Sequence, residues 1–174
     1  VDPFRLCSSN IVDAKLHGAK VLVYTEVTGF IRNQEKITGV KVIDHKTGET
    51  AEYHAPITVN AGGIWGHHIA ELAGAKISMF PAKGALLIFA HRVNSIVLNR
   101  CRKPANADIL VPGDTVCVIG TTSTRVPYEE CDNMHVTPDE VKLLIQEGEK
   151  LALCLNTTRI LRAYAGVRPL VAAE

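Results

Sequence analysis

Three basic residues lie in glycine-bearing or apolar stretches of the chain. They are Lys83 in F-P-A-K-G, Arg125 after G-T-T-S-T, and Arg168 in A-Y-A-G-V-R-P-L. An arginine guanidinium presents a planar set of donors that matches a carboxylate or a phosphate in bidentate geometry. Arg168 is therefore the leading candidate for binding an anion, and a structural salt bridge to Asp or Glu is the alternative. For Lys83 the alternative to a binding role is a solvated lysine beside a strand.

A second candidate site lies in the segment I-T-V-N-A-G-G-I-W-G-H-H-I, which runs from Ile57 to Ile69. The pattern predicts a buried strand over Ile57–Asn60, a tight turn at Gly62-Gly63 and then a helix. Adjacent glycines adopt torsions closed to other residues and let a ligand approach the main chain. A helix that starts after such a turn directs N–H groups at an anionic group such as a phosphate. Parallel α/β units make the same turn for purely structural reasons, so that alternative stays open.

Metal chemistry and nucleophilic catalysis find little support. Adjacent residues on a helix point about 100° apart, so His67 and His68 do not suit a shared metal site. The five cysteines are widely separated and never form a C-x-x-C pair, which predicts reduced thiols and no zinc or disulfide framework. No nucleophile elbow, P-loop or Ser-His-Asp order can be assembled.

The composition indicates a globular protein. With 174 residues, 47% hydrophobic and 21% charged, the chain suits one domain or a piece of a larger one. A net charge of +1 gives no reason to expect a nucleic-acid partner. No apolar run of about 18 residues or signal peptide is found, so we expect a cytosolic protein. The start at Val1 without methionine and the abrupt end at Glu174 suggest a fragment of a longer parent.

The first 70 residues are predicted to alternate helix, strand, hairpin, strand and helix. Asp2 and Pro3 carry the signals of a capped helix start, and Gly18 supplies a stop. Further β elements are predicted at Lys20–Tyr24 and in a hairpin that pairs Gly39–Asp44 with Thr50–Ala55.

The middle of the chain is predicted to be mainly antiparallel β. Ala85–Ala90 is a continuous apolar strand, and Asp108–Val111 pairs with Thr115–Gly120 around a Pro-Gly-Asp turn. The segment Thr137–Glu140 then matches a capping box that begins an amphipathic helix.

Six ordered segments carry a resemblance to a known family. They are V-D-P-F-R-L, V-N-A-G-G-I-W, F-P-A-K-G, D-I-L-V-P-G-D, I-G-T-T-S-T-R and T-R-I-L-R-A-Y-A-G-V-R-P-L. Over essentially its whole length the chain resembles the catalytic A subunits of bacterial anaerobic glycerol-3-phosphate dehydrogenases. That family belongs to the FAD-dependent oxidoreductases that resemble D-amino-acid and glycine oxidases.

The resemblance implies an activity and its setting. Family members oxidise sn-glycerol 3-phosphate to dihydroxyacetone phosphate, pass a hydride to FAD and send electrons to the quinone pool through other subunits, including a membrane-anchoring one. The implied location is cytoplasmic and peripheral to the inner face of the cell membrane. The implied fold is α/β with α+β character: part of a Rossmann-like FAD-binding domain (1–75), an antiparallel-sheet substrate domain (76–160), and a return towards the FAD domain (161–174).

The resemblance also assigns roles to residues. It implies that Arg168 grips the substrate phosphate and that Lys83 contacts substrate at the sheet that roofs the active site. The cofactor contacts that it implies are Val27, Ala61, Gly62 and Gly63.

The chain departs from the family pattern in ways that limit these expectations. Related aerobic enzymes carry a histidine shortly after their K-G-S segment, where this chain has Leu86 or its neighbour, so the catalytic base is unknown. The G-x-G-x-x-G loop that holds the pyrophosphate and a later G-G-K-L segment are missing, so we expect weak or no FAD binding and no turnover from this fragment alone. The alternatives are a glycine-type amino-acid oxidase and a non-catalytic module that holds another subunit.

Overall fold

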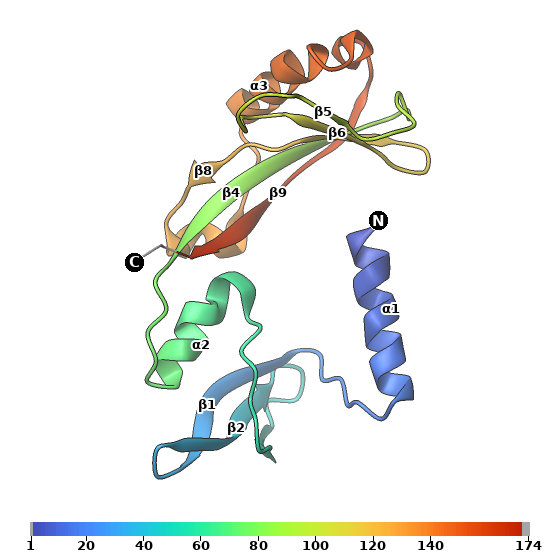
Figure 1. Cartoon of the computed structure of the whole chain (residues 1–174). Coiled ribbons are helices and arrows are strands. Elements are labelled where there is room, and N and C mark those ends of the chain that lie inside the picture. The colour runs from blue at the N-terminus through green and yellow to red at the C-terminus, as the bar shows by residue number, and fades with distance from the viewer. Residues whose placement is uncertain (1, 172–174) are drawn as a thin grey trace. The chain divides into compact units, whose positions relative to one another are not determined.

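The computed structural model describes residues 2–171 as two compact units (Figure 1). One unit contains the residues up to Asn60 together with Ile69–Ala75, and the other contains Ala61–His68 and the residues from Lys76 onward. The glycine turn therefore belongs to the second unit. The expected boundary between residues 75 and 76 remains a prediction about family domains, and the end of the chain at 172–174 lies outside the described residues.

The first unit begins with helix α1 (Pro3–Leu16). The side chain of Asp2 accepts hydrogen bonds from the backbone N–H groups of Phe4 at 2.9 Å and Arg5 at 3.1 Å. Pro3 occupies the first helical position, where its missing N–H costs nothing. The predicted helix start is confirmed.

A three-stranded antiparallel sheet follows, made of β1 (Thr25–Asn33), β2 (Lys36–Asp44) and β3 (Thr50–His54). The predicted hairpin is confirmed, with Ile43 opposite Thr50. The strand predicted at Lys20–Tyr24 is misplaced, because β1 begins only at Thr25. Tyr24 has a φ of 58°, a left-handed conformation that interrupts an extended chain just before β1.

The predicted buried strand at Ile57–Asn60 is wrong. None of the strands among the described residues pairs with this segment, and Ile57 and Val59 are 76% and 79% exposed. A strand needs a neighbouring backbone to satisfy its N–H and C=O groups, and sequence pattern alone does not supply one. The turn and helix that follow are confirmed as a 3₁₀ turn, η1 (Gly63–Trp65), and a short helix, α2 (Gly66–Leu72).

The second unit is built on a six-stranded sheet in the order β5-β6-β7-β4-β8, with β9 paired to β4. Its strands are β4 (Met79–Phe89), β5 (Leu98–Asn99), β6 (Ile109–Pro112), β7 (Cys117–Gly120), β8 (Thr124–Arg125) and β9 (Ile160–Val171). All of its strand pairs are antiparallel, and the predicted β6–β7 hairpin is confirmed. The expected antiparallel sheet is therefore present.

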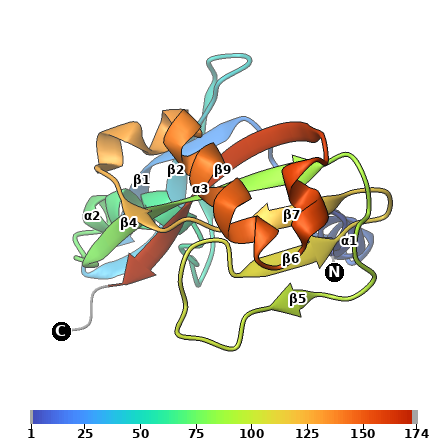
Figure 2. The same ribbon diagram turned by 90° about the horizontal axis from the view of Figure 1, so that it is seen from above.

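Helix α3 (Pro138–Glu149) crosses one face of this sheet (Figure 2). It is preceded by the 3₁₀ segment η2 (Tyr128–Asn133) and followed by η3 (Leu153–Asn156). The predicted capping box is confirmed, because the Thr137 side chain accepts from the Glu140 N–H and the Glu140 carboxylate accepts from the Thr137 N–H.

The core of the second unit lies between α3 and the sheet. Residues of β4 alternate in burial: Ala85, Leu87 and Phe89 are fully buried, whereas Leu86 and Ile88 are half-buried. This alternation follows from the pleat, which turns successive side chains to opposite faces. The sheet therefore has a closed face towards α3 and a more open face on the other side.

None of the helices among residues 2–171 combines the length and the apolar character needed to cross a lipid bilayer.

Two leucines of η3 provide a matched test of this core. Leu155 is 1% exposed and packs in the core cluster, whereas Leu153 is 85% exposed. Leu155→Ala should lower the free energy of unfolding by about 2–5 kcal/mol because it removes buried methyl groups and leaves a cavity. Leu153→Ala should change it by less than about 0.5 kcal/mol. Urea unfolding followed by circular dichroism measures both; equal effects would contradict the described packing.

Candidate functional site

The long antiparallel pair β4–β9 positions the candidate site residues. Lys83 lies opposite Val167, Ala82 opposite Arg168 and Gly84 opposite Gly166. Opposed residues of an antiparallel ladder share a face, and successive residues alternate between faces. Arg168 therefore lies on the open face with Gly84, and Lys83 lies on the face towards α3. The structure does not bring these two predicted substrate-binding residues together.

The guanidinium of Arg168 lies over Gly84. A Cβ atom at Gly84 would come within 2.5 Å of Nη2 of Arg168, so only glycine leaves room for the side chain in this position. Nη1 donates a hydrogen bond to the carbonyl oxygen of Thr122 at 3.2 Å, and Nη2 donates to the hydroxyl of Thr121. The guanidinium is thus held on one side by neutral acceptors.

Among the described residues, the contacts of the Arg168 guanidinium are with neutral acceptors. Within residues 2–171 no carboxylate pairs with it, and the residue is half-buried. The structural salt bridge considered from sequence is thus not formed among the described residues. A partly desolvated guanidinium with neutral acceptors on one side is suited to bind an anion with its remaining donors.

Arg125 shares the open face but is directed elsewhere. It lies opposite Ala82 on β8, and its guanidinium stacks over the Phe80 ring at 5.0 Å from the ring centroid. Phe80 and Gly84 lie on opposite sides of Ala82 along β4, so the two arginines diverge.

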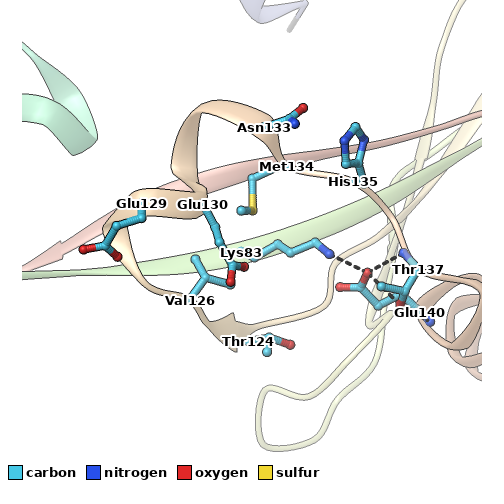
Figure 3. Close-up of a pocket in the computed structure, with 10 residues that line it drawn as sticks. All are labelled: Lys83, Thr124, Val126, Glu129, Glu130, Asn133, Met134, His135, Thr137 and Glu140. Atoms are coloured by element: carbon cyan, nitrogen blue, oxygen red, sulfur yellow. Dashed lines mark hydrogen bonds and ion pairs between the residues drawn. The ribbon is translucent and has the colours of Figure 1, made fainter.

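Lys83 forms a buried ion pair on the closed face (Figure 3). Its Nζ lies 2.8 Å from Oε2 of Glu140, and the two side chains are only 10% and 14% exposed. Burial alone raises the pKa of Glu140, but hydrogen bonds from Lys83 and from the Thr137 N–H outweigh it and hold that pKa below its usual value. The predicted alternative of a solvated lysine does not describe this residue.

An open pocket of about 610 Å³ lies beside this ion pair. Its walls include Glu129, Glu130 and His135 as well as Glu140 (Figure 3). Carboxylates repel a phosphate dianion, and the single lysine there is already paired. A substrate contact by Lys83 stays a prediction, and the described partner of this lysine is Glu140.

Sequence reasoning missed Thr122, which links these features. Thr122 is 2% exposed, and its Oγ1 accepts a hydrogen bond from the Ala85 N–H at 2.9 Å. It also donates to Oε1 of Glu140 at 3.3 Å. The run G-T-T-S-T entered the sequence analysis as the context of Arg125 and as part of a family segment, with no role for Thr122. A hydroxyl-rich turn between two short strands was the available signal.

The glycine turn lies beside β9 within the second unit. Gly63 has a φ of 56°, and a Cβ atom there would meet nothing within 4 Å. A pocket of about 440 Å³ is lined by Gly63–Trp65 together with Ala165–Val167 of β9. Nε1 of Trp65 donates to Asp132 at 2.9 Å and anchors the turn. The main chain of the turn is therefore accessible to a ligand.

The four predicted cofactor residues divide between the units. Ala61, Gly62 and Gly63 belong to the second unit, and Val27 lies in β1 of the first. The turn and β9 line one pocket within the second unit. Contact of a cofactor with any of the four residues stays a prediction. Within the part of the chain that the structure describes, no group of three or more His, Cys, Asp or Glu residues is arranged to hold a metal ion.

Comparison with protein families and curated proteins points to one group. A family model described as FAD dependent oxidoreductase matches residues 1–174. The chain is 62% identical over 174 residues to the A subunit of anaerobic glycerol-3-phosphate dehydrogenase from Haemophilus influenzae, and it covers 31% of that protein's length. It is 61% identical to the corresponding protein of Escherichia coli K12, covering all of this chain and 32% of that one. The chain thus spans about a third of the length of these curated relatives.

Solved structures support the fold. L-proline dehydrogenase from P. horikoshii aligns with a TM-score of 0.73 at 26% identity, covering 96% of this chain and 43% of that one. The FAD complex of a glycerol-3-phosphate dehydrogenase from Bacillus halodurans aligns with a TM-score of 0.74 at 23% identity, covering 92% of this chain and 34% of that one. At this identity, the likeness to the Bacillus halodurans protein supports the fold alone.

The buried Lys83–Glu140 pair should make the free energy of unfolding depend on pH. Because the folded-state pKa of Glu140 is lowered, its contribution is complete above the unfolded value of about 4.3 and is lost as the pH falls through the folded pKa. At pH 7, Glu140→Gln should lower the free energy of unfolding by about 3–5 kcal/mol, since it leaves Lys83 buried without a counter-charge. The variant should also lose less stability on acidification below pH 4 than the parent.

Urea unfolding at several pH values measures this effect. Glu149→Gln, in the last turn of the same helix, serves as the control and should change stability by less than about 0.5 kcal/mol. Parallel pH profiles for the parent and the Glu140→Gln chain would contradict the assignment.

Proposed function

Because the chain belongs to the family of FAD-dependent oxidoreductases, we propose that it forms part of a dehydrogenase that oxidises sn-glycerol 3-phosphate to dihydroxyacetone phosphate. The identity to proteins named as glycerol-3-phosphate dehydrogenase subunits supports this substrate. The observation that carries the proposal is the guanidinium of Arg168, which lies over Gly84 with no carboxylate partner among the described residues.

FAD is the cofactor of the family, and the second unit has features that suit it. Gly63 adopts a positive φ beside an open pocket, with no side chain where a Cβ would project. The main chain of Ala61, Gly62 and Gly63 would lie against the cofactor there, and Val27 of the first unit would contact the adenine. When bound, FAD supplies the acceptor for the hydride that leaves the substrate.

Arg168 would bind and orient the substrate. A phosphate dianion takes charge-assisted hydrogen bonds from a guanidinium in bidentate geometry. Fixing the phosphate fixes the distance and direction of the carbon that is to be oxidised, which lowers the entropy cost of reaching the transition state. Removal of the hydroxyl proton is assigned to no residue of this chain, since the place where the resemblance puts a histidine in aerobic enzymes falls on Leu86 or its neighbour.

The rest of the assembly follows from the same relationship. The relatives are named as one lettered subunit of their dehydrogenases, which supports partner subunits for this chain. We propose that one of these partners anchors the enzyme to the membrane. The enzyme would then lie at the cytoplasmic face of the membrane and pass electrons to the quinone pool.

A second candidate substrate is an amino acid. The structural likeness to L-proline dehydrogenase at 26% identity favours considering it, and an arginine accommodates a carboxylate as well as a phosphate. The assay must therefore include glycine and proline.

Substitution of Arg168 tests the proposal in the full-length FAD-loaded enzyme. Arg168→Ala should raise the KM for sn-glycerol 3-phosphate by roughly 10- to 100-fold, because each lost charge-assisted hydrogen bond costs about 1.5–3 kcal/mol. Arg168→Lys keeps the charge but not the planar donor pair, so its KM should lie between the two. Dye-linked substrate oxidation measures these constants.

Arg159→Ala is the matched control, because Arg159 is an exposed arginine just before β9. Its KM should equal that of the parent. An unchanged KM in Arg168→Ala, or oxidation of glycine or proline in preference to the phosphate ester, would contradict the proposed substrate role.

A further inference from the structure

A chain of hydrogen bonds runs from the closed face of the sheet to Arg168 on the open face. Lys83 donates to Glu140, Thr122 donates to the same carboxylate, and the carbonyl of Thr122 accepts from Arg168. We propose that Thr122 and Glu140 are positioning residues that hold the Arg168 guanidinium in its substrate-binding orientation. The inference rests on the proposed role of Arg168 in binding the substrate phosphate.

The ladder that β4 forms with β7 and β8 is interrupted between these two strands. Strand β4 pairs with β7 as far as Leu86 opposite Gly120, and with β8 from Lys83 opposite Thr124. The segment 121–123 between β7 and β8 therefore lies outside both ladders. Two backbone bonds hold it: the Thr122 N–H donates to the Ala85 carbonyl at 3.4 Å, and the Thr121 carbonyl accepts from the Ala107 N–H at 3.1 Å. The acceptors that hold Arg168 are both on this segment.

The hydroxyl of Thr122 takes the place of a backbone acceptor in this interrupted ladder. Oγ1 accepts from the Ala85 N–H at 2.9 Å and donates its one proton to Glu140 at 3.3 Å. Both functions of the hydroxyl are thus used in a site where Thr122 is 2% exposed. Together with the backbone bond of Thr122 to Ala85, the side chain fixes its own peptide group, and with it the carbonyl that accepts from Arg168.

Glu140 is itself held by further hydrogen bonds. Its Oε2 accepts from Lys83 at 2.8 Å and from the Thr137 N–H at 2.9 Å, which ties it to both β4 and the N-cap of α3. Lys83 would thus act on the substrate site from the opposite face, through Glu140 and Thr122.

These contacts determine the charge of the site as well as the position of the Arg168 guanidinium. A carboxylate beside Arg168 would hold the guanidinium equally well but would neutralise it. A carbonyl and a hydroxyl hold it without cancelling the charge, so the site stays ready for an anion. The ionised carboxylate is kept on the far face, where it neutralises Lys83.

The test compares Thr122→Val with Thr122→Ser in the full-length FAD-loaded enzyme. Valine removes the hydroxyl at similar volume and should raise the KM for sn-glycerol 3-phosphate by about ten-fold with a smaller change in kcat. Serine retains the hydroxyl and should restore a KM near that of the parent. Thr124→Val, an exposed threonine of β8, is the control and should leave the KM unchanged.

A double variant separates positioning from general stabilisation. In an Arg168→Ala background, Thr122→Val should cause no further rise in KM, because its effect acts through the missing guanidinium. Additive effects on KM would overturn the inference, and so would a Thr122→Val enzyme that has lost only thermal stability. If Thr122→Val does not fold, Glu140→Gln decides: its KM should rise at least about three-fold, and an unchanged KM overturns the inference.

Different results would overturn the positioning role of Thr122 and Glu140 and the proposed substrate role of Arg168. If Arg168→Ala raises the KM but the Thr122 and Glu140 variants do not, only the positioning role is lost. If Arg168→Ala itself leaves the KM unchanged, the proposed substrate role fails as well.

Discussion

The antiparallel pairing of β4 with β9 is the constraint on which the candidate site depends. Its register sets Gly84 opposite Gly166 and Arg168 opposite Ala82, which gives the guanidinium a glycine to lie over. The pleat of the same pair places neighbouring residues on different faces, so that one face packs against α3 and the other carries the arginine. A shift of one residue would exchange these faces and bury Arg168 in the core.

The two faces treat positive charge in opposite ways. On the closed face Lys83 is neutralised by Glu140 in a buried pair, which stabilises the folded chain only while both partners are present. On the open face Arg168 is held by the carbonyl of Thr122 and the hydroxyl of Thr121, neither of which removes its charge. The first arrangement suits structure, and the second suits recognition of an anion.

Local signals in the sequence predicted local structure well. The capping box at Thr137–Glu140 and the hairpin of β2 and β3 were predictable because each depends on neighbouring residues. Ile57–Asn60 was mistaken for a strand because pairing depends on a partner that the pattern does not identify. Glu140 was predicted as a cap, but its bond to Lys83 joins residues 57 positions apart and could not be read from spacing. Arg168 could be singled out as a candidate because its local context and its family motif agree.

The KM of a Gly84→Ala enzyme for sn-glycerol 3-phosphate tests the role of Arg168 most directly. The three atoms nearest to the added Cβ all belong to the flexible end of Arg168, so the fold and FAD content should persist while the guanidinium moves. We expect a raised KM, with no change in Gly29→Ala, where a Cβ meets nothing within 4 Å. A Gly84→Ala enzyme with the parent's KM would contradict the claim that Arg168, in this position, binds the substrate.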